Sequence, residues 1–332
     1  MSLARYTVAF AKLRLDSKSY WPEATLHHAP YKPILLMALM DLIAQQVINS
    51  NVIRLNADLM DAFDLYWVRV VGGDRPSNPV MPFNHLRSDG FWHLVDGDGV
   101  EPDLQHVDRN EIFRRIKGQT LFAQLDADLF PLLQVSESRD ALRRVLIEHF
   151  FAPEVRPIIV EVSRITTSSF AYSRDLLNRS RGRFKLEEVP AVEEIYIAEV
   201  RSTAFRRVVV EAYHHTCALC GIRIVTPEGR TSVAAAHIVP WSQSHNDDPR
   251  NGMALCGLHH WIFDQGLVTV TPEYTIKVSP ILALHGQHAH AVVALDGQVI
   301  YKPADHILWP ARVALRWHMH TIFRPVSPPT LL

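Results

Sequence analysis

Residues 217–269, CALCGIRIVTPEGRTSVAAAHIVPWSQSHNDDPRNGMALCGLHHWIFDQGLVT, hold all three cysteines of the chain. The first two cysteines form a CxxC pair, and the third forms a CxxH pair with a histidine further along. Two such pairs on separate turns offer four soft ligands at the spacing of a tetrahedral structural zinc site. The predicted ligands of this Zn²⁺ site are Cys217, Cys220, Cys256 and His259.

Three further polar residues lie in a fixed order around these pairs. His237 lies in AHIVP between the pairs, Asn251 opens NGMALC, and His260 follows the second pair. This order of His, Asn and His, together with NGMALCxLHHxxFDxG, resembles the HNH endonuclease family over roughly residues 205–272. His259 and His260 could exchange roles, and we assign zinc to His259 because CxxH matches CxxC in reach.

The resemblance implies a ββα-metal unit, in which a hairpin and a helix clasp one divalent cation. His237 would end the first strand, Asn251 would lie in the loop after the second strand, and His260 would open the helix. The implied activity is hydrolysis of DNA phosphodiester bonds, with His237 as general base, since an imidazole can take a proton from water near neutral pH. His260 would ligate the catalytic Mg²⁺ or Mn²⁺. Asn251 would either ligate this metal or pin the loop that orients His237.

One position departs from the family pattern. Many HNH enzymes carry a metal-ligating Asp, Glu or His directly before the general base, and Ala236 stands there in this chain. Asp264 lies four residues after His260, so the two side chains share one face of a helix. We therefore predict Asp264 as the second ligand of the catalytic metal, with Asp247 and Asp248 as alternatives.

The composition indicates an ordinary globular protein of two or three domains. The chain has 332 residues, of which 48% are apolar and 21% charged, and its net charge is −1. Contacts with DNA must therefore come from local basic patches. No apolar run approaches the roughly 20 residues of a membrane helix, and the first residues lack the apolar core of a secretory signal. Thiols reserved for zinc fit a reducing compartment, so we expect a cytoplasmic protein without membrane contact.

The N-terminal half carries a second pair of motifs. APYKPILLMALMDL, residues 29–42, predicts a buried helix because it is apolar nearly all round and its prolines fall at the first turn. A loop predicted over residues 72–79 leads into MPFNHLRSDGFWHL, residues 81–94, with a strand at FWHLV. Helical patterns are also present at 4–15, from about 56, 110–117 and 138–151.

These two motifs resemble the sulfur-binding domain of phosphorothioate-dependent restriction endonucleases over roughly residues 1–152. That resemblance implies a domain that grips duplex DNA and recognises a phosphorothioate. Sulfur is larger and less strongly hydrated than oxygen, so a small apolar cup favours it. Pro82 would form the cup with Met81 and His85. The flanking phosphates and bases would be held by His28, Tyr31, Lys32 and Arg87. Met81 stands where a tyrosine is expected, and His28 where an arginine is expected.

The remaining segments connect and close these two parts. Residues 153–200 are predicted to be a basic linker with a helix, whose arginines contact phosphates. The arginines named for this role are Arg179, Arg181 and Arg183. A helix is predicted over 191–216. TIKVSP and AVVALDGQVIYKP are predicted to pair as a hairpin with its turn at Asp296 and Gly297, and a final helix is predicted from about Pro310.

Together these patterns predict an α+β protein with a mainly helical DNA-reading domain at 1–152, the linker at 153–200 and a zinc-stabilised HNH domain at 201–332. The predicted function is a modification-dependent restriction endonuclease that acts on phosphorothioate double-stranded DNA. One active site per chain favours a homodimer for cutting both strands. An HNH endonuclease that reads a methylated base or an unmodified sequence is one alternative. A non-catalytic, zinc-stabilised DNA-binding protein is the other, motivated by Ala236.

Overall fold

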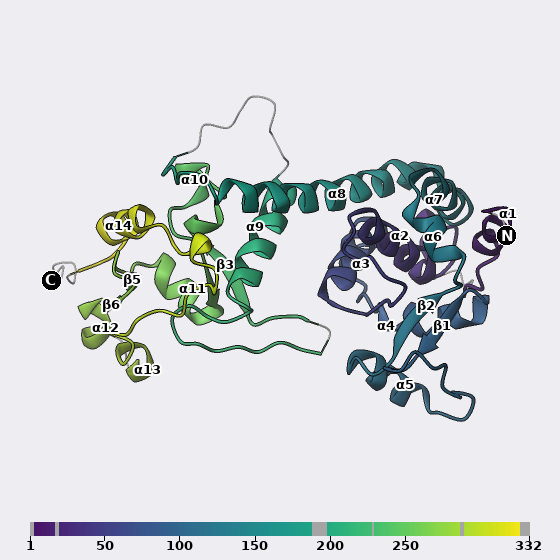
Figure 1. Ribbon diagram of the computed structural model, residues 1–332, viewed down its shortest axis with the longest axis horizontal. Coiled ribbons are helices and arrows are strands. Elements are labelled where there is room, and N and C mark those ends of the chain that lie inside the picture. Colours follow the sequence, from purple (N-terminus) through teal and green to yellow (C-terminus); the bar gives the residue numbers. More distant parts are fainter. Residues whose placement is uncertain (1–2, 17–19, 188–197, 228, 286–288, 326–332) are drawn as a thin grey trace. The chain divides into compact units, whose positions relative to one another are not determined.

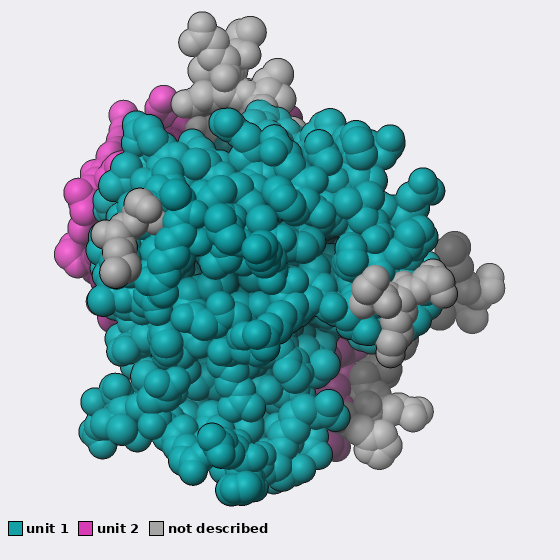
Figure 2. Space-filling view, turned by 90° about the vertical axis from the view of Figure 1, so that its right-hand side faces the viewer, with its two compact units in different colours: residues 1–168, 227–230 teal, residues 169–226, 231–332 magenta. Residues whose placement is uncertain are grey.

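The computed structural model of the protein describes residues 3–16, 20–187, 198–227, 229–285 and 289–325 (Figure 1). The chain divides into two compact units, residues 1–168 with 227–230 and residues 169–226 with 231–332 (Figure 2). The boundary falls inside helix α8 (Arg156–Arg179), which contributes residues to both units. Helices combined with small antiparallel sheets confirm the predicted α+β class.

The first unit is mainly helical. Its helices and strands are α1 (Leu3–Ala11), α2 (Tyr31–Ala44), α3 (Ala57–Val70), α4 (Val80–His85), β1 (Trp92–Val95), α5 (Arg109–Lys117), β2 (Phe122–Leu125), α6 (Leu129–Gln134) and α7 (Ser136–Phe150), with short 3₁₀ turns at η1 (Glu23–Thr25), η2 (Leu86–Asp89) and η3 (Pro153–Val155). The helices predicted from the apolar periodicity and the FWHLV strand are all present. β1 and β2 form an antiparallel pair.

Helix α2 is the centre of the first unit. Every residue from Lys32 to Ile43 is buried, as the apolar sequence predicted, and each fully buried Leu, Ile or Met side chain contributes about 1.5–3 kcal/mol. The one carboxylate in this run, Asp41, is paired with Arg143 at 2.7 Å. Asp41 also accepts hydrogen bonds from Tyr66 and Ser163, each at 2.7 Å. The charge is therefore compensated inside the core.

The second unit contains the predicted ββα arrangement. Its elements are α9 (Ala198–Ala212), β3 (Val233–His237), α10 (Trp241–Ser244), η4 (Pro249–Asn251), β4 (Gly252–Cys256), α11 (Gly257–Asp264), β5 (Val268–Val270), β6 (Ile276–Val278), α12 (Pro280–His285), α13 (His290–Val293), η5 (His306–Leu308) and α14 (Arg312–Thr321). β3 and β4 pair antiparallel, with His237 opposite Gly252 and Val233 opposite Cys256. α11 follows β4 directly, so both zinc pairs and the HNH residues meet in this unit.

Asn251 lies in a different place from the one predicted. It ends η4 and precedes the second strand, because β4 begins at Gly252. Asp248 caps η4 by accepting a hydrogen bond from the Arg250 backbone N–H, so the chain turns here and extends only from Gly252. Asn251 therefore belongs to the loop between the two strands.

The predicted hairpin after the HNH region is also wrong in part. TIKVSP does contain a strand, β6, but its antiparallel partner is β5. AVVALDGQVIYKP begins instead in α13, and only Val299 forms a bridge, to Thr275. Short apolar runs fit a buried helix as well as a strand, and here the helical turn buries Val292 and Leu295. The predicted helix over 191–216 is present as α9, and its first residues, 191–197, lie outside the described residues.

No helix within the described ranges is both long and apolar enough to cross a membrane.

Gly266 lies just after α11, the helix that carries His259 and His260. Its φ is +68°, and the Leu267 N–H returns to the Ile262 carbonyl at 2.9 Å, as in a Schellman helix end. A Cβ on Gly266 would lie 2.1 Å from the Ile322 carbonyl oxygen. Glycine is therefore required by both the backbone conformation and the close approach of the chain after α14.

We predict that Gly266→Ala destabilises the second unit, because the left-handed conformation alone costs roughly 1–3 kcal/mol and the carbonyl contact adds to it. The measurement is thermal unfolding followed by circular dichroism. Gly257→Ala is the matched control, since a Cβ there meets nothing within 4 Å. Equal melting temperatures for the two variants would contradict this account of the helix end.

Candidate functional site

The predicted zinc ligands converge in the second unit. Sγ atoms of the three cysteines and a ring nitrogen of His259 all lie within 4.8 Å of one another. His259 Nδ1 is 3.4 Å from Cys217 Sγ and 3.2 Å from Cys256 Sγ. One ion at the centre of such a group reaches each ligand at the usual zinc distances of about 2.0–2.3 Å. Three sulfurs and one imidazole fit a structural Zn²⁺ site.

Burial sets the protonation of these ligands. Burial raises the pKa of the Cys217 and Cys256 thiols, and it lowers the pKa of His259. Neutral imidazole is the form that binds metal, whereas the thiols must lose their protons on binding. Metal binding is therefore coupled to the release of protons from these thiols, whereas the imidazole is already in its metal-binding form.

Neighbouring histidines on α11 point in different directions. His259 is buried against the cysteines, whereas His260 is partly exposed and lies 3.6 Å from Asp264, Nε2 to Oδ2. Consecutive helical residues are about 100° apart around the axis, so one turn serves two sites. This geometry supports His259 as the zinc ligand and separates His260 from the zinc cluster.

His260 and Asp264 face a cleft of about 430 Å³ in the second unit. His237 lines the same cleft from the end of β3. The cleft thus brings together one partly exposed imidazole on a strand and an imidazole–carboxylate pair on a helix. Burial raises the pKa of Asp264, and the nearby His260 partly offsets this. The remaining lining residues are Ala235, Ile238, Pro240, Trp241, His318 and Ile322.

The ring of His237 is held on two sides. Phe205 on α9 stacks against it with the ring centroids 3.8 Å apart and the planes 7° from parallel. Its Nε2 lies 3.0 Å from Asp247 Oδ1. Close packing of Phe205 depends on Gly252, whose missing Cβ would lie 2.8 Å from Phe205 Cζ.

Asn251 is fully buried, and its side chain forms hydrogen bonds with backbone groups. Its Oδ1 accepts from the Val239 N–H at 2.9 Å, and its Nδ2 donates to the carbonyls of Val239 and Asn246, both at 3.0 Å. Asn251 thus ties the loop before β4 to the residues that follow His237. Of the two predicted roles, pinning this loop is the one that fits these contacts.

The alternative metal-ligand candidates are engaged elsewhere. Asp248 forms a bidentate pair with Arg250, at 2.9 and 2.7 Å. Asp247 is bonded to His237 and Arg201. Ala236 is buried, and Ala235 rather than Ala236 lines the cleft beside His237, because alternate residues of a strand face the same side.

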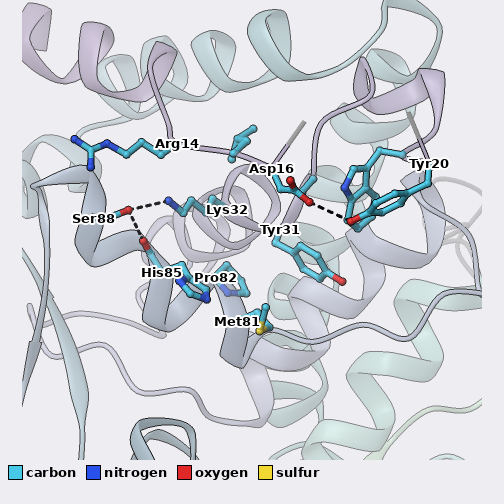
Figure 3. Close-up of a pocket in the computed structure, with 12 residues that line it drawn as sticks. Arg14, Asp16, Tyr20, Tyr31, Lys32, Met81, Pro82, His85 and Ser88 are labelled. Atoms are coloured by element: carbon cyan, nitrogen blue, oxygen red, sulfur yellow. Dashed lines mark hydrogen bonds between the residues drawn. The ribbon is translucent and has the colours of Figure 1, made fainter. Parts of the chain in front are cut away.

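A second cavity, of about 450 Å³, lies in the first unit (Figure 3). It gathers five of the predicted sulfur-site residues. Tyr31 and Lys32 come from the start of α2, whereas Met81, Pro82 and His85 come from α4. Burial, followed by the charges of Lys32 and two arginines, lowers the pKa of His85. The imidazole is therefore neutral at pH 7 and can both donate and accept.

Lys32 is not a free cation in this cavity. Its Nζ lies 2.6 Å from Asp89 Oδ2, and both side chains are almost fully buried. It also donates to Ser88 Oγ at 3.3 Å (Figure 3). Asp89 therefore offsets the positive charge of Lys32, which the sequence analysis predicted to hold a phosphate or base of DNA.

Other predicted DNA-contacting residues lie apart from this cavity. His28 is not among its lining residues, and Arg87 lines a separate hollow together with Glu101 and Asp103. On α8, Arg179 pairs with Asp175 at 2.6 Å. The other two named arginines, Arg181 and Arg183, follow α8 and are exposed.

The sequence interpretation also missed several residues of the two cavities. Arg14, Asp16 and Tyr20 line the first-unit cavity opposite α4 (Figure 3). No motif marks them, because they precede α2 in an irregular segment. In the second unit the missed contacts are those of Phe205 and Arg201, which come from α9, far from the HNH motif in sequence.

Comparison with known proteins finds a family match within the second unit. Residues 217–271 match the family model described as HNH endonuclease. The chain carries an HNH endonuclease domain. No curated protein matches the chain.

Two solved structures are similar to parts of the chain. The modification-dependent TagI restriction endonuclease is 25% identical over 36% of this chain and 37% of its own, with a TM-score of 0.27. The sulfur-binding domain of SprMcrA, complexed with phosphorothioated DNA, is 19% identical over 49% of this chain and 94% of its own, with a TM-score of 0.37. The matched region thus spans little more than a third of the TagI enzyme.

We predict that Cys256→Ser and His259→Ala each lose the bound zinc and lower the melting temperature. The binding free energy of a structural zinc, about 10–16 kcal/mol in small zinc modules at neutral pH, is also folding free energy. His260→Ala is the matched control, because it alters the adjacent residue outside the cluster. Zinc content by atomic emission and thermal unfolding are the measurements. Loss of zinc with unchanged melting would show that the cluster does not stabilise the fold.

Proposed function

We propose that the protein is a metal-dependent DNA endonuclease whose reaction takes place in the second-unit cleft. The observation that supports this most directly is that His237 and the His260–Asp264 pair line one cleft inside the region matched to the HNH family. An imidazole on a strand and two metal-type ligands on a helix are the groups that phosphodiester hydrolysis requires.

In this proposal His237 takes a proton from the attacking water. Its partial exposure in the cleft gives water access, and the stack on Phe205 keeps the ring in one plane. Asn251 acts through the loop: its three backbone contacts hold the residues after His237 in place. General-base catalysis by a positioned imidazole contributes about 10²–10⁴ in rate.

His260 and Asp264 would hold the catalytic Mg²⁺ or Mn²⁺. Their ligand atoms, 3.6 Å apart, lie on successive turns of α11 and open to the same cleft. When bound, the ion would neutralise charge on the phosphate and on the leaving oxygen. Two protein ligands leave room for oxygens of DNA and water around it.

His237→Ala is predicted to reduce plasmid nicking by about 10²–10⁴, because the proton acceptor is removed. Zinc content and duplex binding are predicted to stay at wild-type values, since the imidazole lies outside the zinc cluster. Nicking in Mg²⁺ or Mn²⁺ is followed on gels, and zinc and binding are measured on the same preparation. His245→Ala is the matched control, a histidine of the same region outside the cleft. Wild-type turnover in the alanine variant would refute the base assignment.

We further propose that the first-unit cavity reads a phosphorothioate in double-stranded DNA. Pro82 and Met81 give one wall of the cavity an apolar face next to a neutral imidazole, His85. A phosphate oxygen placed there would lose water without gaining a donor from proline, at a cost of about 1–3 kcal/mol. Sulfur is less strongly hydrated and gains dispersion contacts instead.

The cation that holds the phosphate at this cavity is then a different residue from Lys32, one of those named from the sequence. Lys32 is compensated by Asp89, whereas the Arg14 side chain is exposed at the same cavity. We therefore assign a phosphate contact to Arg14, with Arg181 and Arg183 as further contacts beyond α8. Among the described residues, one cleft combines His237 with the His260–Asp264 pair. Because a duplex has two strands, two copies would act together on one duplex.

Pro82→Ala is predicted to lower binding of a phosphorothioate duplex towards that of the plain duplex, while plain binding stays unchanged. The ratio of the two dissociation constants, roughly 5- to 150-fold if the unmet hydrogen bond costs about 1–3 kcal/mol, should fall. Matched duplexes with and without one sulfur are titrated at two salt concentrations. Pro76→Ala, in the exposed loop before α4, is the control.

Arg14→Ala is the companion variant in the same titration. It should weaken binding to both duplexes and reduce the salt slope by about one ion, as loss of one phosphate contact does. A wild type without any sulfur preference would overturn the phosphorothioate proposal and leave the nuclease proposal intact. Preference for a methylated duplex would identify a different mark, and duplex binding without cleavage would identify a DNA-binding protein.

A further inference from the structure

A buried carboxylate lies behind the proposed general base. Asp247 is almost completely buried, with 1% of its side chain exposed. Its Oδ1 is 3.0 Å from His237 Nε2, and its Oδ2 accepts from Arg201 Nε at 2.8 Å. The Tyr172 hydroxyl donates to Oδ2 at 3.2 Å. Donors from α8, α9 and β3 therefore meet at one carboxylate.

The pair fixes where the proton of His237 lies. A carboxylate can only accept hydrogen bonds, so Nε2 must carry the hydrogen that joins the two groups. A neutral imidazole has one N–H, which leaves the lone pair on Nδ1. Among the described residues, Asp247 is the side chain that forms a hydrogen bond with the His237 ring. The same ring lines the cleft.

The carboxylate is itself held rigidly. Arg201 lies over the ring of Trp241, with its guanidinium carbon 3.6 Å from the centroid, and bonds Asp247 from there. Burial raises the pKa of Asp247, but the hydrogen bonds from His237 and Arg201 outweigh it, so the pKa is lower than usual. Asp247 is therefore ionised at neutral pH.

We infer that Asp247 is a positioning residue for His237, which holds the ring as the Nε2–H tautomer and presents Nδ1 to the attacking water. This inference rests on the proposed function, because it needs His237 to act as the base. It replaces the earlier candidate role of Asp247 as a metal ligand, since both carboxylate oxygens are already bonded within the protein.

The proton balance of the step follows from this arrangement. The water O–H bond breaks as the oxygen attacks phosphorus, and its proton forms a bond to Nδ1. The negative charge of the Asp247 carboxylate stabilises the imidazolium that results. The carboxylate stays ionised and does not take the proton. The same division of labour between a histidine and a buried aspartate is known from serine proteases. The proton then leaves from Nδ1 to solvent in the cleft.

The first test measures the tautomer of His237 in the wild-type protein. ¹⁵N-labelled histidine distinguishes a protonated from an unprotonated ring nitrogen by NMR, and His237→Gln identifies the resonances. The expected spectrum has Nε2 protonated and Nδ1 unprotonated at a pH where the ring is neutral. The Nδ1–H tautomer would overturn the inference.

The second test compares two adjacent aspartates. Asp247→Asn should lower the single-turnover cleavage rate at saturating duplex by roughly 10–100-fold, the range for loss of an orienting partner, with duplex affinity and zinc content unchanged. Asp248→Asn is the matched control: Asp248 is also buried and also pairs with an arginine, Arg250, but does not touch His237. Its rate should remain close to wild type.

The outcomes separate this inference from the nuclease proposal. Wild-type cleavage with an unaffected Asp247→Asn rate overturns the positioning role alone, and so does an equal loss in both aspartate variants. A wild type that shows the Nε2–H tautomer but cuts no duplex overturns the nuclease proposal, and the positioning role with it. Partial rescue by Asp247→Glu, which keeps a carboxylate, supports the inference.

Discussion

The HNH domain depends on one cluster of four side chains that ties three segments together. Cys217 and Cys220 come from the turn after α9, Cys256 ends β4, and His259 belongs to the first turn of α11. A hairpin of two five-residue strands and an eight-residue helix has too little apolar surface to hold its own geometry. The cluster joins the end of the hairpin to the start of the helix, and the proposed reactive side chains extend from these two elements.

Around that cluster the domain uses close contacts to set the position of individual rings. Gly252 allows Phe205 to approach β4, and Phe205 in turn stacks on His237. The side-chain amide of Asn251 donates hydrogen bonds to backbone carbonyls of the same loop. The residues that make these contacts are close in space but belong to α9, β3 and the loop before β4. The position of each side chain therefore depends on the packing of all three segments. The cleft is therefore preorganised by packing as well as by hydrogen bonds.

The sequence was informative where the pattern is local. The spacing of the cysteines and of His259 led directly to the cluster that the structure shows, and the apolar run after Lys32 predicted the buried helix α2. It was not informative where the contact is tertiary. Nothing local indicates that Lys32 is paired with Asp89, 57 residues later. The same holds for Asp247, whose bond to Arg201 joins residues 46 positions apart.

The two neighbouring histidines of α11 have a consequence for experiments with chelators. His259 belongs to the cluster that could hold zinc and His260 to the cleft, so a zinc ion bound in the cluster would support the same helical turn that carries His260. A chelator strong enough to strip the cluster would stop cleavage even with the reactive groups chemically intact. Inhibition by such a reagent therefore says nothing by itself about which metal the reaction uses. Only the order in which zinc and then Mg²⁺ or Mn²⁺ restore activity can separate folding from chemistry.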